Sequence, residues 1–186
     1  MKKRFLAFII DIILVTVLCL IICNLMANKE TKILNNKLDI ITDQVLSNEI
    51  SNKNYLSDYF YINYKIDKIN IVSEMISFFI IIFYFIIVPV YTKGQTLGLK
   101  LMKLKIKGKV SIQNMFRRNI ITIGLLIYIA KIILIYVLNY KMYYIIMFIL
   151  LFIQLLLVII STFMILYNED KKGLQDKLSS TYIEEV

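Results

Sequence analysis

The 186-residue sequence contains no histidine and no tryptophan, a single proline and only two cysteines. Without histidine the chain lacks the usual general base near neutral pH and the commonest metal ligand, which argues against most hydrolases and metalloenzymes. Two cysteines cannot build a disulfide framework. Charged residues are also scarce, at 19%, whereas 59% of the residues are hydrophobic. Because a water-soluble domain is usually about half apolar and roughly a quarter charged, this composition indicates a protein that resides in a lipid bilayer.

Four apolar runs are long enough to cross the hydrocarbon core of a membrane, which takes roughly 20 helical residues. They cover residues 5–26, 71–91, 120–138 and 143–167. The runs lack the alternating polarity of barrel strands, and backbone groups in lipid must be satisfied within their own segment, so each run is predicted to be a helix. We therefore expect an all-α fold, a single membrane domain of four transmembrane helices. A cleaved signal peptide is the alternative for the first run, but its length and the buried Asp11 disfavour it.

The positions of lysine and arginine predict the orientation of these helices. The segment 92–119 carries many basic residues and no acidic one, and both the N-terminus and the tail 168–186 add further lysines. In the segment 27–70, by contrast, acidic and basic residues balance. The positive-inside rule then places both termini and 92–119 in the cytoplasm and 27–70 outside. The net charge of +9 is interpreted as an orientation signal, and nucleic acid is not expected as a partner.

The two longer polar segments have their own patterns. Within 27–70, apolar residues at steps of three and four over 34–45 predict an amphipathic helix, and 55–71 is either a second short helix or an extended stretch at the headgroup level. In the basic segment 92–119, Thr96 can cap a short helix, and the alternation of apolar and polar residues predicts a hairpin whose turn is centred on Gly108. One longer basic helix interrupted by Gly108 is the alternative. Either form would be a short basic interfacial segment that contacts anionic lipid headgroups.

Ionisable residues inside the membrane need partners, because an unpaired charge near the bilayer centre costs about 2.5 to 3.5 kcal/mol. If the third helix packs against the first, Asp11 could pair with Lys131 from mid-bilayer or with Arg118 from the cytoplasmic boundary. Gln154 lies at a similar depth and could hydrogen-bond near Lys131, whereas Glu74 is expected to reach water at the outer boundary. The candidate ion or proton site consists of Asp11, Lys131, Arg118 and Gln154. It is either a static ion pair or a carboxylate that takes up a proton or a small cation.

No catalytic motif accompanies these charges. The stretch Gly94-Gln95-Thr96-Leu97-Gly98 lacks the spacing of a Walker phosphate-binding loop and follows a membrane helix instead of a strand. The sequence has neither a serine nucleophile elbow nor a Cys/His cluster. We therefore expect no enzyme activity, no cofactor and no metal site.

Three separated pieces of the sequence together resemble a known family. Arg4-Phe-Leu-Ala-Phe-Ile-Ile-Asp11 opens the first helix, Gly94-Gln95-Thr96-Leu97-Gly98-Leu99-Lys100-Leu101 follows the second, and the segment 170–181, which contains Gln175 and Asp176, follows the fourth. Their order and placement are similar to the RDD family of bacterial membrane proteins, named for an arginine and two aspartates, here Arg4, Asp11 and Asp176. The family typically has a histidine where this chain has Gln175 and a basic residue where it has Leu99. The resemblance implies a bacterial cytoplasmic membrane and suggests transport, including sodium/proton exchange.

The resemblance also sharpens the predictions for the tail and for function. Asp176 is expected to fold back under the bundle and to pair with Arg4 first, or otherwise with Lys100 or Arg118. One functional hypothesis is a small cation or cation/proton transporter that uses Asp11 and Lys131, for which four helices would require a homo-oligomer. The alternative is a non-catalytic scaffold or accessory protein that binds lipid or another membrane protein.

Overall fold

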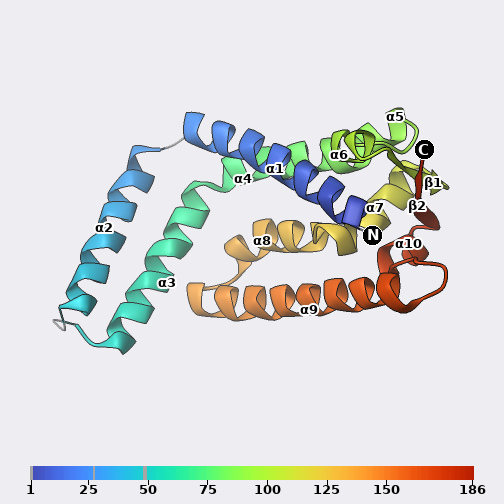
Figure 1. The fold of residues 1–186 in the computed structure, drawn as a ribbon. Helices are drawn as coiled ribbons and strands as arrows, with labels where there is room; N and C mark the ends of the chain where they lie inside the picture. Colours follow the sequence, from blue (N-terminus) through green and yellow to red (C-terminus); the bar gives the residue numbers. More distant parts are fainter. Residues whose placement is uncertain (1, 27, 48–49) are drawn as a thin grey trace.

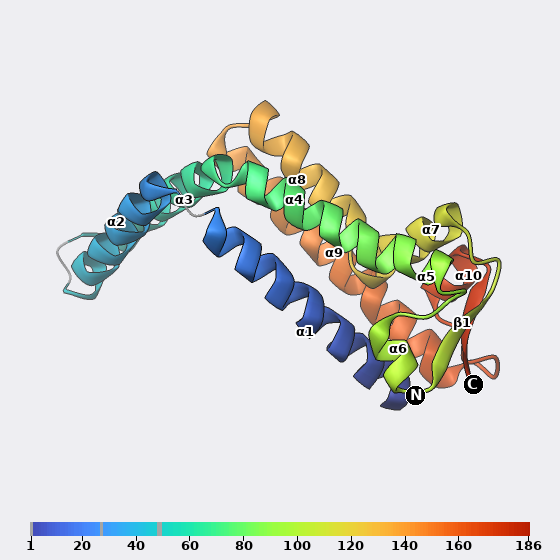
Figure 2. The same cartoon turned by 90° about the horizontal axis from the view of Figure 1, so that it is seen from above.

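The computed structural model describes residues 2–26, 28–47 and 50–186 as a mainly helical bundle (Figure 1). In both views α1 lies beside α4 and α9 lies beside α8 (Figures 1 and 2). Both termini lie at one end of the bundle, here called the terminal end, and the helices α2 and α3 project from the opposite end, here called the hairpin end. The elements in chain order are α1 (Lys2–Leu25), α2 (Lys29–Leu46), α3 (Asn52–Ile69), α4 (Ile71–Ile82), η1 (Phe83–Ile87), α5 (Val88–Tyr91), α6 (Leu97–Leu101), β1 (Leu104–Gly108), α7 (Ile112–Thr122), α8 (Leu125–Val137), α9 (Tyr140–Tyr167), α10 (Leu174–Leu178) and β2 (Thr181–Glu185).

Three helical segments are long and apolar enough to cross a membrane: α1, the continuous stretch Ile71–Tyr91, and α9. The bent pair α7 and α8 provides a fourth span if its two parts are counted together. The expected membrane bundle is thus confirmed in outline. Most apolar side chains of α1 and α9 face outward, as they would toward lipid.

The third span is not the straight helix that the apolar run 120–138 predicted. It breaks between α7 and α8, which meet at 79°. Gly124 lies at the break with a φ of +67°, a left-handed conformation that glycine adopts without steric cost. Hydropathy over a window of residues reports the solvent around a segment but not its direction, so the prediction of one continuous helix was wrong.

The middle of the second span is a π-helix, η1, instead of a regular α-helix. The buried Asn119 of α7 donates hydrogen bonds from its side-chain nitrogen to the carbonyls of Phe85, at 2.8 Å, and of Met115, at 2.9 Å. π-helical turns leave backbone carbonyls with altered partners and occur often at functional sites. In this span the turn carries Tyr84, whose side chain enters the candidate site.

The polar segment after α1 forms two helices, α2 and α3, that pack against each other. The helix expected over 34–45 is confirmed, and the open alternative for 55–71 resolves as a helix. In the second half of α3, the Tyr64 hydroxyl donates to the carbonyls of Ile135, at 2.7 Å, and Leu138, at 2.9 Å. These bonds satisfy the last turn of α8 and join α3 to the bundle.

A two-stranded antiparallel sheet is the main departure from the all-α prediction. Strand β1 pairs with β2 from the C-terminal tail, with Ile106 opposite Ile183 and Gly108 opposite Thr181. The predicted hairpin centred on Gly108, and its alternative of a single interrupted helix, were both wrong. Gly108 is required because the tail crosses it closely: a Cβ there would lie 2.5 Å from the Ser180 carbonyl oxygen.

The largest hydrophobic core lies at the terminal end, where the second span, α6, β1 and α7 meet α1. Its buried members are Ala7, Val15, Ile81, Tyr84, Phe85, Ile86, Leu99, Leu104, Ile106, Met115 and Leu125. This core holds the first two sequence pieces named above together, and the third packs against α7 through α10.

Candidate functional site

Asp11 is the central buried charge of the terminal end, with 3% of its surface exposed. Its carboxylate accepts hydrogen bonds from the Tyr84 hydroxyl, from the Thr96 hydroxyl at 2.5 Å and from the Gly98 backbone N–H at 2.7 Å. The three donors come from η1 and from the start of α6. Asp11 therefore fastens both the second span and the following loop to α1.

The two hydroxyls that bond Asp11 are themselves held by backbone N–H groups. The Tyr84 hydroxyl oxygen accepts from the Leu97 N–H at 3.2 Å, and the Thr96 hydroxyl oxygen accepts from the Leu99 N–H at 3.3 Å. A hydroxyl has only one hydrogen, and in both residues that hydrogen is directed at the carboxylate. With the Gly98 N–H, three hydrogen-bond donors converge on the Asp11 carboxylate.

The glycines of the loop motif permit this close packing. A Cβ on Gly98 would lie 2.1 Å from the Ala7 carbonyl oxygen, and one on Gly94, which has a φ of +102°, would lie 2.1 Å from the Ile106 carbonyl oxygen. The Gln95 side chain donates to the Leu104 carbonyl at 3.2 Å. Thr96 caps α6, which confirms the predicted short helix, and Lys100 points outward from it.

Neither of the basic partners predicted for Asp11 reaches it. Lys131 instead bonds Glu74 at 2.5 Å and Asp67 at 3.4 Å, toward the hairpin end of the bundle. Glu74 is thus paired within the bundle and does not simply reach outward to water as expected. Lys131 therefore lies toward the hairpin end beside the start of α4, whereas Asp11 lies at the terminal end.

Gln154 was predicted to lie near Lys131 and lies instead at the break of the third span. Its side-chain nitrogen donates to the Ile121 carbonyl at 2.6 Å. The end of α7 leaves carbonyls without helical partners, and Gln154 satisfies one of them from α9. A Cβ on Gly124 would come within 3.4 Å of the Gln154 side chain, so the break and the glutamine are packed together.

The two remaining family residues lie on the C-terminal side of the site. Asp176 of α10 forms a buried ion pair with Arg118, and their side chains are 1% and 6% exposed. The Arg118 guanidinium also donates to the Thr181 hydroxyl at 2.9 Å, and Asp176 accepts from the Gly173 N–H at 2.9 Å. The tail therefore folds back as predicted, but Arg118 and not Arg4 is the partner of Asp176.

The Arg4 side chain binds the backbone of the C-terminal tail. Its guanidinium donates to the Lys171 carbonyl at 2.9 Å and to the Ile183 carbonyl. Among the residues that the structure describes, no carboxylate lies within ion-pair distance of Arg4. The guanidinium is thus fixed in place while its charge is not neutralised by a direct contact.

Two exposed ion pairs join the edges of the tail strand to the rest of the terminal end. Lys3 bonds Glu185 at 2.8 Å, and this hydrogen bond lowers the pKa of that carboxyl. Lys107 bonds Glu184 at 2.7 Å, which raises the pKa of the ammonium group. Because both pairs are exposed, each contributes little to the stability of the sheet.

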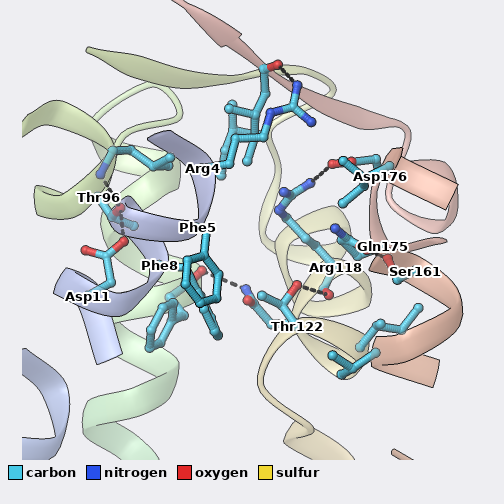
Figure 3. Close-up of a pocket in the computed structure, with 18 of the residues that line it drawn as sticks. Arg4, Phe5, Phe8, Asp11, Thr96, Arg118, Thr122, Ser161, Gln175 and Asp176 are labelled. Carbon is cyan, nitrogen blue, oxygen red and sulfur yellow. Dashed lines mark hydrogen bonds and ion pairs between the residues drawn. The ribbon is translucent and has the colours of Figure 1, made fainter. Parts of the chain in front are cut away.

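A cavity of about 220 Å³ lies between these groups. Figure 3 shows Asp11 and Thr96 on one side and Arg118 and Asp176 on the other. Most of its wall is apolar: Phe5 and Phe8 come from α1, and α9 faces them with Val158, Thr162 and Ile165. Phe5 is 64% exposed, so the wall extends to the outer surface of the bundle.

Two residues at the site, Tyr84 and Asn119, have no signal that a single sequence could reveal. They lie in stretches without a motif, and the π-helical turn that carries Tyr84 does not alter the apolar pattern of its span. In the part of the chain that the structure describes, no three histidine, cysteine or acidic side chains lie close enough to hold a metal ion.

Comparison with known families gives one match. The model of the RDD family matches residues 1–180, which is nearly the whole chain. No curated protein and no solved structure gave a significant match.

Proposed function

The chain belongs to the RDD family, and from this premise we propose that it is a non-catalytic protein of the bacterial cytoplasmic membrane that binds a membrane lipid at its terminal end. Both termini are inside in this proposal. The excess of basic residues in 92–119, together with the basic N-terminus and tail, supports that orientation, because such residues are retained on the cytoplasmic side. The terminal end then lies in the cytoplasmic leaflet.

The cavity between α1 and α9 is the observation that carries the proposal. A water molecule occupies about 30 Å³ of liquid, so a space of about 220 Å³ is larger than a few ordered waters require. Its walls are mainly apolar, and apolar walls favour a hydrocarbon chain over an ion. Since Phe5 lies on the lipid-facing side, a chain from the surrounding leaflet could enter sideways without crossing a polar barrier.

The hydrogen bonds of Asp11 support lipid binding over ion transport. Three donors already hold the carboxylate, and both hydroxyl donors are oriented by backbone N–H groups. These donors occupy three of the roughly four lone-pair positions of the carboxylate, which leaves few positions for coordinating a cation. The carboxylate is therefore interpreted as an anchor that fixes α6 and η1 to α1 and so shapes the cavity.

Lipid retention in purified protein tests this proposal. Thr162 lines the cavity from α9, so Thr162→Trp should fill it, whereas Ile159→Trp on the outward side of the same helix should not. Native mass spectrometry in a mild detergent would count the lipids bound to each variant. We expect one retained lipid in the wild type and in Ile159→Trp, and a loss of at least about tenfold in Thr162→Trp, as each displaced methylene removes about 0.8 kcal/mol. Equal retention in all three would refute the proposal.

A second candidate function, transport of a small cation or of protons, is favoured by one observation. Asp11 lines the cavity and has no ion-pair partner within the described residues. The candidate would require the wild type to conduct protons or cations in liposomes and Asp11→Asn to abolish the flux. Asp58→Asn, an exposed aspartate of α3, is the matched control. Flux that depends on Asp11 but not on Asp58 would replace lipid binding as the preferred function.

A further inference from the structure

A second cavity adjoins the first at the very end of the bundle. It measures about 260 Å³ and shares Arg4, Ile165 and Ile183 with the cavity described above. Of the residues that line the second cavity and not the first, Lys3, Lys171 and Glu185 are charged and Leu104 and Leu166 are apolar. The two cavities are therefore neighbours, and the second adds two lysines at the end of the bundle.

The charges of the second cavity do not cancel. Three basic side chains face a single acid, and that acid, Glu185, is already paired with Lys3. Lys171 has no ion-pair partner among the described residues, and Arg4 contacts only backbone carbonyls. The positive charges of Arg4 and Lys171 therefore remain without a paired acid in the second cavity, among the residues that the structure describes. A guanidinium has five N–H donors, so Arg4 retains free donors while two carbonyls hold it in place.

The depth of the second cavity matches that of a lipid headgroup. Arg4 lies in the first turn of α1 and Ile165 in the last turn of α9, so the cavity lies where two spanning helices reach the membrane boundary. Phosphate oxygens at this level would meet the Arg4 guanidinium, whose planar fork fits a phosphate with two parallel hydrogen bonds. The Lys171 ammonium would add a second positive charge.

We propose that the second cavity binds the phosphate of an anionic phospholipid whose acyl chain occupies the first cavity. This inference rests on the proposed lipid-binding function and adds a selectivity for charge. A phospholipid that carries a net negative charge gains from both unmatched bases, whereas the quaternary ammonium of a choline headgroup would lie near the same positive charges and offset that gain.

Competition between two lipids tests the selectivity. The full-length protein would be placed in nanodiscs that contain equal amounts of phosphatidylglycerol and phosphatidylcholine with matched chains, and the retained lipid would be identified by native mass spectrometry. We expect phosphatidylglycerol to predominate by about tenfold or more, because each nearby basic residue typically favours an anionic lipid by about fivefold. Equal retention of the two lipids would overturn the inference and would leave the proposed function intact.

Substitution of Lys171 tests whether the second cavity is the source of the preference for anionic lipid. Lys171→Gln removes an exposed charge whose side chain makes no ion pair in the described part of the chain, so the fold should persist. We expect it to reduce the preference about fivefold, and Lys177→Gln, which lies outside both cavities on the same tail, to leave it unchanged. An unchanged preference in Lys171→Gln, or an equal loss in both variants, would contradict the site.

A soluble phosphate distinguishes a lipid from a free anion. Glycerol 3-phosphate carries the phosphate without the hydrocarbon chain, and at millimolar concentration it should not displace the phospholipid. Displacement by glycerol 3-phosphate would overturn the lipid assignment and indicate a site for soluble phosphates. If no lipid of either kind is retained, the proposed function fails as well.

Discussion

Replacing Gly98 with alanine tests the attachment of α6 to α1 most sharply. On helix propensity alone, alanine should stabilise a helical position by about 1 kcal/mol relative to glycine. The structure predicts the opposite sign. The new Cβ would lie 2.1 Å from the Ala7 carbonyl oxygen and 2.8 Å from the Asp11 carboxyl carbon. Because the nearest atom belongs to the backbone, no side-chain rotation can relieve the clash.

The magnitude follows from the hydrogen bonds that the displacement would break. Moving α6 away separates Asp11 from the Gly98 N–H and from the Thr96 hydroxyl, which lie at 2.7 Å and 2.5 Å. A hydrogen bond to a charged group contributes roughly 1.5–3 kcal/mol, so losing both, less about 1 kcal/mol of helix propensity, destabilises the protein by about 2–5 kcal/mol. For a chain of this size the melting temperature should fall by roughly 4–20 °C.

Thermal unfolding in detergent, followed by the circular dichroism of the helices, measures this shift. Lys100→Ala is the matched control, because it also adds an alanine to α6 but at an exposed position. We expect the control to unfold within about 2 °C of the wild type, as surface substitutions usually change stability by less than 0.5 kcal/mol. A Gly98→Ala variant that melts at or above the wild-type temperature would refute the close packing of α6 on α1.

Three further substitutions test the pairs that hold the bundle. Arg118→Gln leaves Asp176 buried without a counter-charge and should destabilise the protein by about 3–5 kcal/mol, whereas the same change at the exposed Arg117 should be nearly neutral in denaturant unfolding. Lys131→Met leaves its two carboxylate partners unpaired. Because these side chains are about a quarter exposed, the loss should be about 1–3 kcal/mol, visible as a lower melting temperature. Gln154→Leu removes one hydrogen bond from the broken span and should cost less than about 2 kcal/mol; a larger loss would mean that the amide has another role.

The spanning segments could be predicted because hydrophobicity is a local property of the sequence. The runs 71–91 and 143–167 correspond closely to helical stretches in the structure, and Thr96 caps the short helix expected after it. The direction of a helix, by contrast, depends on how it packs against distant parts of the chain. Gly124 stood within an apolar run, and nothing in that run indicated that the chain turns through 79° there.

The partners of the charged residues were harder to predict because they depend on contacts between distant segments. Asp11 was expected to find a base, but a carboxylate can equally be satisfied by three neutral donors, and the tyrosine among them lies 73 residues away in sequence. The alternating residues of β1 were correctly suspected of being extended. Their partner is the C-terminal tail, so a search for a local turn at Gly108 could not find it.

Photo-crosslinking from a lipid chain tests the central claim most directly. A phospholipid with a diazirine on its acyl chain would be incorporated with the protein into nanodiscs and activated, and the labelled residues would be identified by mass spectrometry. We expect labels on the cavity residues Phe8, Val158 and Thr162, and loss of these labels in Thr162→Trp. Labels confined to outward-facing positions of α9 such as Ile159, with none on Phe8, would contradict a lipid bound inside the bundle.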